Sequence, residues 1–375
     1  MKIVIDARLY GLENAGIGRY LIHLLEELQK TDKKNKYIVL LRKKYFETAR
    51  LKKNFTKVLA DFSVYGFAEQ IKLPFLLYFL SPHVAHFPHF NIPLLWRGRY
   101  VVTIHDMTMH TSNATSSTHS PIIFSLKKLC YKWVFGRTIL GATRIIVPSK
   151  SVLSVIGKSF PNVLQKTKVV YQGFDRKAWS GKHPLHILSP EEVARQPFFV
   201  YVGSLYPHKN VGALVKALSI YNKHAQKNIN LAVIGAKNVF LNKLLKSIEK
   251  VGVAKNVLVL GFVKDTDVSS IMKRSLGLVY PSLSEGFGLQ GLEAMSSGTL
   301  VLASNIPIFR EVYDKHAIYF DPKSPFDIAK KIESVVKLKA GQRRLRIKQA
   351  RQFIKKYSWH KMAKETLAVY RKALD

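Results

Sequence analysis

The sequence predicts an α/β protein made of two doubly wound units. Its 375 residues correspond to two or three domains at roughly 150 residues each. Short apolar runs alternate with longer segments of helical periodicity, which is the pattern of a parallel sheet covered by helices on both faces. The pattern breaks off over Gly173–Pro197, which has no clear periodicity, and then starts again. We therefore expect a linker over this stretch.

Each unit contains five predicted strands. They are Lys2–Asp6, Tyr37–Leu41, Val84–Phe87, Tyr100–Ile104 and Arg144–Val147 before the linker, and Phe198–Val202, Leu231–Ile234, Val257–Leu260, Gly277–Tyr280 and Leu300–Ala303 after it. The spacing of apolar residues predicts helices over Ile17–Gln29, Ser125–Leu140, Val211–Lys223 and Asn242–Val251. Two such units predict a cleft between them, where ligands meet the carboxyl ends of the strands.

The chain is strongly basic. Its 60 Lys and Arg residues outnumber 24 Asp and Glu, which gives a formal net charge of +36. Such a charge favours an anionic partner, namely nucleic acid, a lipid surface or a phosphorylated substrate. The alternative is that lysines are spread evenly over solvated faces. A single cysteine, Cys130, excludes a disulfide scaffold and a multi-cysteine zinc site, and its place in an apolar helix predicts that it is buried.

No apolar run reaches the roughly 18 residues that a membrane span requires. The longest are Leu73–Leu80 and Phe198–Leu205. At the amino terminus the apolar run is short, and Asp6 and Arg8 follow at once, so we expect a first strand rather than a signal peptide. These features predict a cytoplasmic protein that touches membranes without crossing them.

The most informative stretch is Tyr280–Ala303, YPSLSEGFGLQGLEAMSSGTLVLA. A strand ends here, Glu285 sits in the loop that follows, and a helix begins near Leu289, directly after two glycines. Glycines before a helix let the backbone approach a ligand closely. The unpaired N–H groups and the positive dipole end of a helix N-terminus suit phosphate.

A second carboxylate, Glu293, lies about one turn inside this helix. Glu285 and Glu293 could flank a diphosphate and hydrogen-bond the sugars on its two sides. The alternative is a pair of surface glutamates on a glycine-rich turn. The pair, with GFG after the first Glu and then EAM and LVLASN, resembles the signature of retaining glycosyltransferases of family 4. That family has the GT-B fold, in which two Rossmann-like domains face each other across a nucleotide-sugar cleft.

Further segments resemble the mannosyltransferase-like branch of this family, in the same order along the chain. They are Gly16–Tyr20 (GIGRY), His86–Leu94 (HFPHFNIPL), Val101–Met107 (VVTIHDM), Val147–Ser151 (VPSKS), Val169–Asp175 (VVYQGFD), Tyr201–Asn210 (YVGSLYPHKN) and Tyr357–Ala363 (YSWHKMA). The resemblance implies an acceptor-side domain over residues 1–175 and a nucleotide-sugar-binding domain over residues 176–357. It also implies that a C-terminal helix, residues 358–375, packs back on the first domain.

The resemblance assigns roles to single residues. Glu285 contacts the hydroxyls of the donor sugar, and Glu293 contacts the ribose. Lys209 binds phosphate, and its charge neutralises the departing diphosphate. His105 lies near the donor sugar and the reacting centre; read alone, it could equally be structural. The backbone groups that hold or approach the diphosphate are those of Gly16, Gly286, Phe287, Gly288 and Leu289.

Two departures from the family pattern stand out. Ser204, which we place at the donor site, occupies a position where many members have an arginine that forms a clamp with the lysine. The clamp is therefore weaker, or another base such as Arg8 or Arg19 contributes. Gln172 stands where asparagine is usual, and no consequence follows from the sequence.

We expect no cofactor and no metal, with a nucleotide sugar such as GDP-mannose or UDP-glucose as co-substrate. The N-terminus of the helix near Leu289 and the charge of Lys209 can take over the work of a diphosphate-bound Mg²⁺ or Mn²⁺. His86 and His89 could suggest a metal pair, but no carboxylate or cysteine spacing supports zinc. An acceptor-side or packing role is the expected one for both.

Three segments concentrate the positive charge: Arg42–Val58, Lys337–Asp375 and Phe124–Leu140. Read as basic helices with aromatic residues on another face, they favour an anionic membrane surface. The alternative is a solvated helix face whose apolar side packs in the core. Nucleic acid is not an expected partner, because no helix-turn-helix, zinc-finger, RRM or KH signature is present.

The sequence thus predicts a retaining hexosyltransferase of the mannose or glucose type. Its acceptor is expected to be a lipid-linked or cell-envelope glycan, reached from the inner face of the membrane. The alternatives are a glucosyltransferase resembling glycogen or starch synthase, with a soluble polysaccharide acceptor, and a non-enzymatic polyanion-binding protein.

Overall fold

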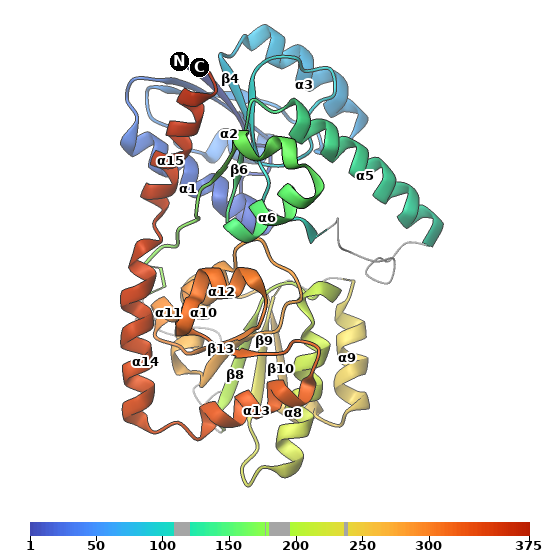
Figure 1. Cartoon of the computed structure of the whole chain (residues 1–375), viewed down its shortest axis with the longest axis vertical. Coiled ribbons are helices and arrows are strands. Elements are labelled where there is room, and N and C mark those ends of the chain that lie inside the picture. Colours follow the sequence, from blue (N-terminus) through green and yellow to red (C-terminus); the bar gives the residue numbers. More distant parts are fainter. Residues whose placement is uncertain (109–120, 177, 180–195, 236–238) are drawn as a thin grey trace. The chain divides into compact units, whose positions relative to one another are not determined.

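The computed structural model describes residues 1–108, 121–176, 178–179, 196–235 and 239–375 (Figure 1). The chain divides into two compact units. We call Met1–Gly173 together with Ser358–Asp375 the amino-terminal unit, and Phe174–Tyr357 the carboxyl-terminal unit. Each unit holds one parallel sheet with helices around it, so the predicted α/β class is confirmed. Most of the predicted linker lies outside the described residues.

The amino-terminal sheet has the strand order β3-β2-β1-β4-β5-β6-β7, and every neighbouring pair is parallel. Its strands are β1 (Lys2–Asp6), β2 (Lys36–Leu41), β3 (Phe55–Leu59), β4 (Val84–Phe87), β5 (Tyr100–Thr103), β6 (Arg144–Val147) and β7 (Thr167–Val169). Its helices are α1 (Ala15–Thr31), α2 (Lys43–Thr48), α3 (Phe67–Leu80), α5 (Pro121–Gly141), α6 (Lys150–Ser159) and α15 (Trp359–Lys372).

Packing in this unit follows the apolar pattern of the sequence. All four residues of β4 and of β5 are buried, as expected for central strands covered on both faces. On α1 the buried residues include Leu21, Leu24, Leu25 and Leu28, which share one face at helical spacing. The last helix, α15, packs on α1, so the carboxyl end of the chain completes the unit that contains its beginning (Figure 1).

The carboxyl-terminal sheet has the order β10-β9-β8-β11-β12-β13 and is also parallel throughout. Its strands are β8 (Phe198–Val202), β9 (Asn230–Ile234), β10 (Val257–Gly261), β11 (Gly277–Tyr280), β12 (Val301–Ser304) and β13 (Ile318–Phe320). Its helices are α8 (Val211–His224), α9 (Leu241–Lys250), α10 (Asp265–Arg274), α11 (Leu289–Ser297), α12 (Pro307–Tyr313), α13 (Pro325–Val336) and α14 (Ala340–Phe353). The strand order reverses between β8 and β11, and the crevice outside the carboxyl ends of such a strand pair is where open α/β sheets bind ligands.

The structure corrects three expectations. The basic segment Arg42–Val58 is not one helix, because it divides into α2 and the strand β3. The run Leu73–Leu80 belongs to a 14-residue helix, α3, that the sequence did not predict. Cys130 is exposed on α5 rather than buried. Among the described residues, no helix is both long and apolar enough to cross a membrane.

Candidate active site

Lys209 and Glu285 meet at the carboxyl ends of β8 and β11. The two strands are hydrogen-bonded neighbours, with Gly277 opposite Phe199 and Leu278 opposite Val200. Each of the two side chains lies in the segment that follows its strand. Residues 76 positions apart in sequence are therefore brought together by the reversal of strand order, where a ligand site is expected.

The two side chains form an ion pair. Lys209 Nζ lies 2.6 Å from Glu285 Oε1, and the side chains are only 16% and 10% exposed. The hydroxyl of Ser282, which is completely buried, donates to the same carboxylate oxygen at 2.7 Å. Partial burial strengthens such a pair over one in open water, and the second bond fixes the orientation of the carboxylate.

The backbone around Lys209 is tied to the loop that carries Glu285. The N–H of Leu283 donates to the carbonyl of His208 at 2.7 Å. Asn210 adopts the left-handed conformation with φ 57°, and its side-chain amide donates to the carbonyls of Pro281 (3.1 Å) and Pro322 (2.8 Å). These bonds hold the lysine turn in register with the glutamate loop. The sequence did not identify Asn210 or Ser282 as site residues.

Helix α11 begins directly after the Glu285 loop, at a glycine N-cap. Gly288 has φ 89°, and no side chain caps the first N–H groups of α11. A Cβ atom at Gly288 would lie 2.4 Å from the hydroxyl oxygen of Tyr313, which donates to the Gly288 carbonyl. Glycine is thus required both by the backbone conformation and by the packing of Tyr313. An uncapped helix N-terminus beside a lysine is chemically suited to a phosphate group.

The other predicted donor residues surround this turn. Phe287 is 4% exposed and packs edge-on against Tyr357 at 5.6 Å between ring centroids, so its ring is part of the core. Glu293 lies inside α11 and is buried, and Leu289 opens that helix. Ser204 follows β8, and its carbonyl accepts a hydrogen bond from the Tyr201 hydroxyl.

His105 and Gly16 belong to the amino-terminal unit. Gly16 lies in the first turn of α1, and a Cβ atom there would meet nothing within 4 Å. Two residues beyond β5, the His105 ring packs edge-on against Tyr20 with 4.9 Å between ring centroids. Burial lowers the pKa of His105 to about 4, so its imidazole is neutral at neutral pH.

The contact between Gln172 and His105 explains the unusual glutamine. Gln172 is buried, and its Nε2 lies 3.2 Å from His105 Nδ1. An amide nitrogen can only donate, so Nδ1 accepts and the proton of the neutral ring sits on Nε2. Among the described residues, His105 Nε2 is buried and has no hydrogen-bond partner. The backbone carbonyl of Pro88 also acts on the ring as a hydrogen-bond acceptor that raises its pKa.

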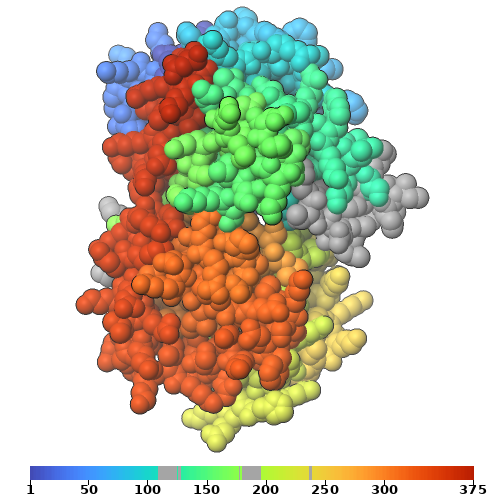
Figure 2. Space-filling model, in the orientation of Figure 1, coloured from blue at the N-terminus to red at the C-terminus, as the bar shows by residue number. Residues whose placement is uncertain are grey.

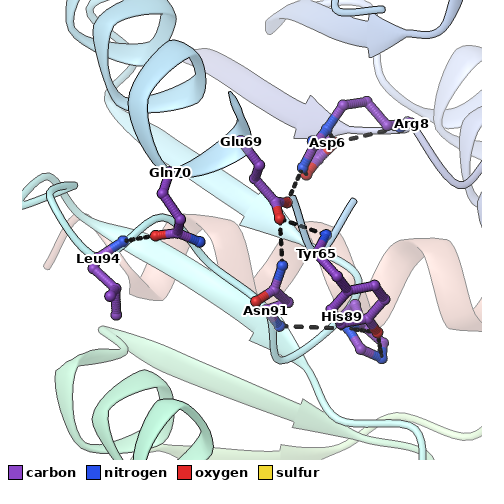
Figure 3. A network of polar contacts seen from close by, with 8 residues as sticks. All are labelled: Asp6, Arg8, Tyr65, Glu69, Gln70, His89, Asn91 and Leu94. Carbon is purple, nitrogen blue, oxygen red and sulfur yellow. Dashed lines mark hydrogen bonds and ion pairs between the residues drawn. The ribbon is translucent and has the colours of Figure 1, made fainter. Parts of the chain in front are cut away.

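Arg8 is engaged within its own unit. It is 2% exposed, and its guanidinium donates to Asp6 at 2.8 and 2.7 Å and to Glu69 at 2.6 Å (Figure 3). Although burial acts to lower the pKa of Arg8, these two carboxylates raise it. Glu69 also accepts from the Tyr65 N–H at 2.7 Å. Two buried carboxylates thus pair with Arg8, whereas its Nη1 is buried and has no hydrogen-bond partner among the described residues. A part for Arg8 in the clamp stays a prediction.

His86 is a buried structural residue. Its Nε2 lies 2.8 Å from the Thr103 hydroxyl, and its Nδ1 lies 2.6 Å from the hydroxyl of Tyr370 on α15. Burial lowers the pKa of His86 to about 3. His89 pairs with the Tyr65 hydroxyl at 2.9 Å. In the part of the chain that the structure describes, no group of three or more His, Cys, Asp or Glu side chains could hold a metal ion.

The chain has recognisable relatives. Residues 188–353 match the family model described as glycosyl transferases group 1. The chain is 24% identical, over 69% of its length, to the O-antigen chain mannosyltransferase RfbU of Salmonella typhimurium, and this match covers 66% of that protein. It is 26% identical, over 72% of its length, to the serotype-specific mannosyltransferase WbdA of Escherichia coli, but covers only 31% of it.

Solved structures show the same fold. Anabaena HepE, solved in complex with UDP and glucose, superimposes with a TM-score of 0.75 over 99% of both chains at 17% sequence identity. The group 1 match covers most of the carboxyl-terminal unit, including Lys209, Glu285 and α11. Residues 188–353 thus match the group 1 glycosyltransferases, and the two parallel α/β units have the GT-B fold.

Proposed function

We propose that the protein transfers a hexose, of the mannose or glucose type, from a nucleotide diphosphate sugar to a hydroxyl of a lipid-linked or cell-envelope glycan. The single observation that carries the donor assignment is the Lys209–Glu285 ion pair of 2.6 Å beside the uncapped N-terminus of α11. A cation and a set of helix N–H groups together match a diphosphate, and the adjacent carboxylate matches sugar hydroxyls.

The relatives support this choice of substrates. Two of them are named as O-antigen or serotype-specific mannosyltransferases, which favours a mannose donor such as GDP-mannose and an envelope glycan as acceptor. Anabaena HepE was solved with UDP and glucose, which favours a nucleotide sugar as donor and keeps UDP-glucose as the second candidate. We propose a cytoplasmic enzyme, bound peripherally at the inner face of the membrane.

The proposed reaction retains the anomeric configuration and needs no metal. Lys209 and the first N–H groups of α11 would stabilise the charge that develops on the departing diphosphate. Front-face attack by the acceptor hydroxyl, with its proton taken by that diphosphate, accounts for retention without a second carboxylate acting as nucleophile. His105, neutral at neutral pH, would hydrogen-bond the donor sugar through Nε2 during the transfer.

Product analysis tests this proposal. Purified enzyme is incubated with GDP-mannose or UDP-glucose and a membrane extract that contains lipid-linked glycan, with and without excess EDTA. We expect mass spectrometry to show one added hexose in both conditions, and NMR to show the anomeric configuration of the donor. Transfer that EDTA abolishes and Mn²⁺ restores would refute metal independence. An inverted product would refute the front-face course, and transfer to soluble polysaccharide alone would move the enzyme to the synthase-like alternative.

A further inference from the structure

One face of α3 exposes large apolar side chains that the protein does not cover. Phe67, Phe75 and Phe79 are 93%, 70% and 86% exposed. With Ile71 and Tyr78, also exposed, they form what we call the α3 stripe. Residues four apart lie on one face of a helix, so Phe67, Ile71, Phe75 and Phe79 make a continuous row along all 14 residues of α3. The segment lies at the molecular surface (Figure 2).

The opposite face of α3 anchors the helix firmly. Leu73 and Leu77 are completely buried in the core of the amino-terminal unit. Glu69, the one acidic residue of α3, is buried in its contacts with Arg8 and the Tyr65 N–H (Figure 3). The helix is thus fixed by one apolar face while it presents a second to the exterior. A helix that is apolar all round is ordinarily covered on all sides, so the exposed row marks a contact surface.

The segments beside the stripe continue it with apolar and basic residues. The Tyr78 hydroxyl donates to the Leu95 carbonyl at 2.9 Å and accepts from the Arg97 N–H at 3.1 Å. This places the exposed side chains of Leu95 and Arg97 next to the end of α3. Arg137 of α5 donates to the adjacent Leu94 carbonyl at 3.3 Å, and the exposed face of α5 carries Trp133.

The chain from residue 70 to residue 174, which includes most of the stripe together with Arg97 and Arg137, is almost entirely positive in charge. Between residues 70 and 174 the sequence contains twelve Lys and Arg but a single acidic residue, Asp106. A second copy of the chain would bring two such surfaces together and repel itself. An anionic bilayer complements the charge, because each Lys or Arg near the leaflet contributes about 1 kcal/mol while aromatic rings partition into the headgroup region.

We propose that the α3 stripe, with Leu95 and Arg97, inserts into the interfacial region of an anionic lipid bilayer. This deepens the proposed peripheral location by naming the surface that makes the contact. The contact is made by a helix packed firmly on the amino-terminal unit, and not by the segment Arg42–Val58, which divides into α2 and β3. Salt should leave the contribution of the apolar side chains to membrane binding unchanged, whereas it screens the contribution of the flanking Lys and Arg side chains.

Co-sedimentation with vesicles tests the proposal on the full chain. The test variant replaces Phe75 and Phe79 with glutamine. The matched control replaces Phe262 and Phe326 with glutamine. These two residues belong to the carboxyl-terminal unit and are 75% and 69% exposed. We expect the wild type and the control variant to bind vesicles that contain phosphatidylglycerol. Both should bind little to vesicles of pure phosphatidylcholine. The Phe75→Gln/Phe79→Gln variant should lose roughly tenfold or more in partition coefficient.

A labelling experiment keeps the proposal testable if that variant folds poorly. In a Cys130→Ser background, an environment-sensitive dye on Ile71→Cys should shift to the blue when phosphatidylglycerol vesicles are added. The same dye on Phe326→Cys should not shift. Equal vesicle binding by test and control variants, or an unchanged dye spectrum, overturns the proposal.

Two further readouts separate the alternatives. A dimer seen by light scattering that Phe75→Gln/Phe79→Gln converts to a monomer, without any vesicle binding by the wild type, assigns the stripe to a second copy and overturns the proposal. Donor turnover without vesicles should be the same in all variants. Vesicle binding by a protein that turns over no nucleotide sugar would refute the proposed function while the membrane surface stands.

Discussion

The Lys209 ammonium and the Glu285 carboxylate lie 2.6 Å apart, on segments that follow two hydrogen-bonded neighbouring strands. Both side chains are mostly shielded from water, so neither is a freely solvated surface charge. A lysine ammonium has three N–H donors. When one of them is bound to a carboxylate, the others can still bind a phosphate. The pair is therefore where we propose that a diphosphate and a sugar are held next to each other.

Removing Glu285 should abolish most turnover while the fold survives. We expect Glu285→Ala and Lys209→Met each to lower kcat/KM by roughly a hundredfold or more, the size of effect seen when one stabilising group of a transition state is lost. Lys216→Met, a change on the exposed face of α8, is the matched control and should behave as wild type. Near-normal turnover of Glu285→Ala with every donor tested would contradict the assignment, provided that its circular dichroism is unchanged.

Replacing His105 should reduce the rate of transfer more than it weakens donor binding. In the role that the family resemblance implies, His105 acts on the donor sugar and not on the nucleotide. We expect His105→Ala to lower kcat while the Kd of the nucleotide changes little. Gln172→Leu removes the 3.2 Å contact to Nδ1 and should lower kcat less than His105→Ala does. The double variant should have the same kcat as His105→Ala alone. Additive losses would show that the two residues act separately.

Gly288 should not tolerate a side chain. Alanine there would be strained at φ 89° and its Cβ would clash with Tyr313, so we expect a loss of about 1–3 kcal/mol in the free energy of unfolding. Gly212→Ala, in the first turn of α8 with nothing within 4 Å of its Cβ, should be neutral or slightly stabilising. Urea denaturation of both variants makes the comparison. Equal stability of the two would contradict the packing described for the α11 turn.

Acidification should destabilise the amino-terminal unit through its buried histidines. Burial lowers the pKa of His86 to about 3, compared with 6.5 for an ordinary histidine. Between about pH 6.5 and about pH 3 the unfolded chain binds a proton that the folded chain does not, so the free energy of unfolding decreases as the pH is lowered. His86→Gln should flatten this slope. Three of the four tryptophans belong to this unit, namely Trp96, Trp133 and Trp359, so their fluorescence reports its unfolding in urea at pH 7 and pH 5. If the free energy of unfolding depended on pH equally in the variant and the wild type, the prediction would be contradicted.

Much of the carboxyl-terminal unit could be predicted because its signals are local. Strands β8 and β11 appear in the sequence as uninterrupted apolar runs, and their observed bounds are those predicted. The loop with Glu285 and the start of α11 at Leu289 follow directly. What could not be predicted is how these segments are braced. The bonds from Asn210 to Pro281 and Pro322 join residues 71 and 112 positions apart, and no spacing rule reveals them.

The amino-terminal unit was harder because its signals conflict. Helix α3 contains Pro74 in its interior and apolar residues on both faces, so neither helical periodicity nor proline rules favour it. Strand β3 lies in a lysine-rich segment that reads as a solvated helix. The pairing of Gln172 with His105 spans 67 residues, and the buried network of Arg8 depends on Glu69, which reads as a surface residue of an unrecognised helix.

The most direct test of the donor site is nucleoside diphosphate release from a panel of nucleotide sugars. Three proteins are assayed: the wild type, Glu285→Gln and the control Lys216→Met. The donors are GDP-mannose, UDP-glucose and other hexoses linked to GDP or UDP. We predict that the wild type and the control release nucleoside diphosphate from one class of donor. With that donor, the rate of release by Glu285→Gln should be lower by roughly a hundredfold or more. Turnover that is equal in wild type and Glu285→Gln, or the absence of turnover and binding for every nucleotide sugar, would contradict a donor site built on Lys209, Glu285 and α11.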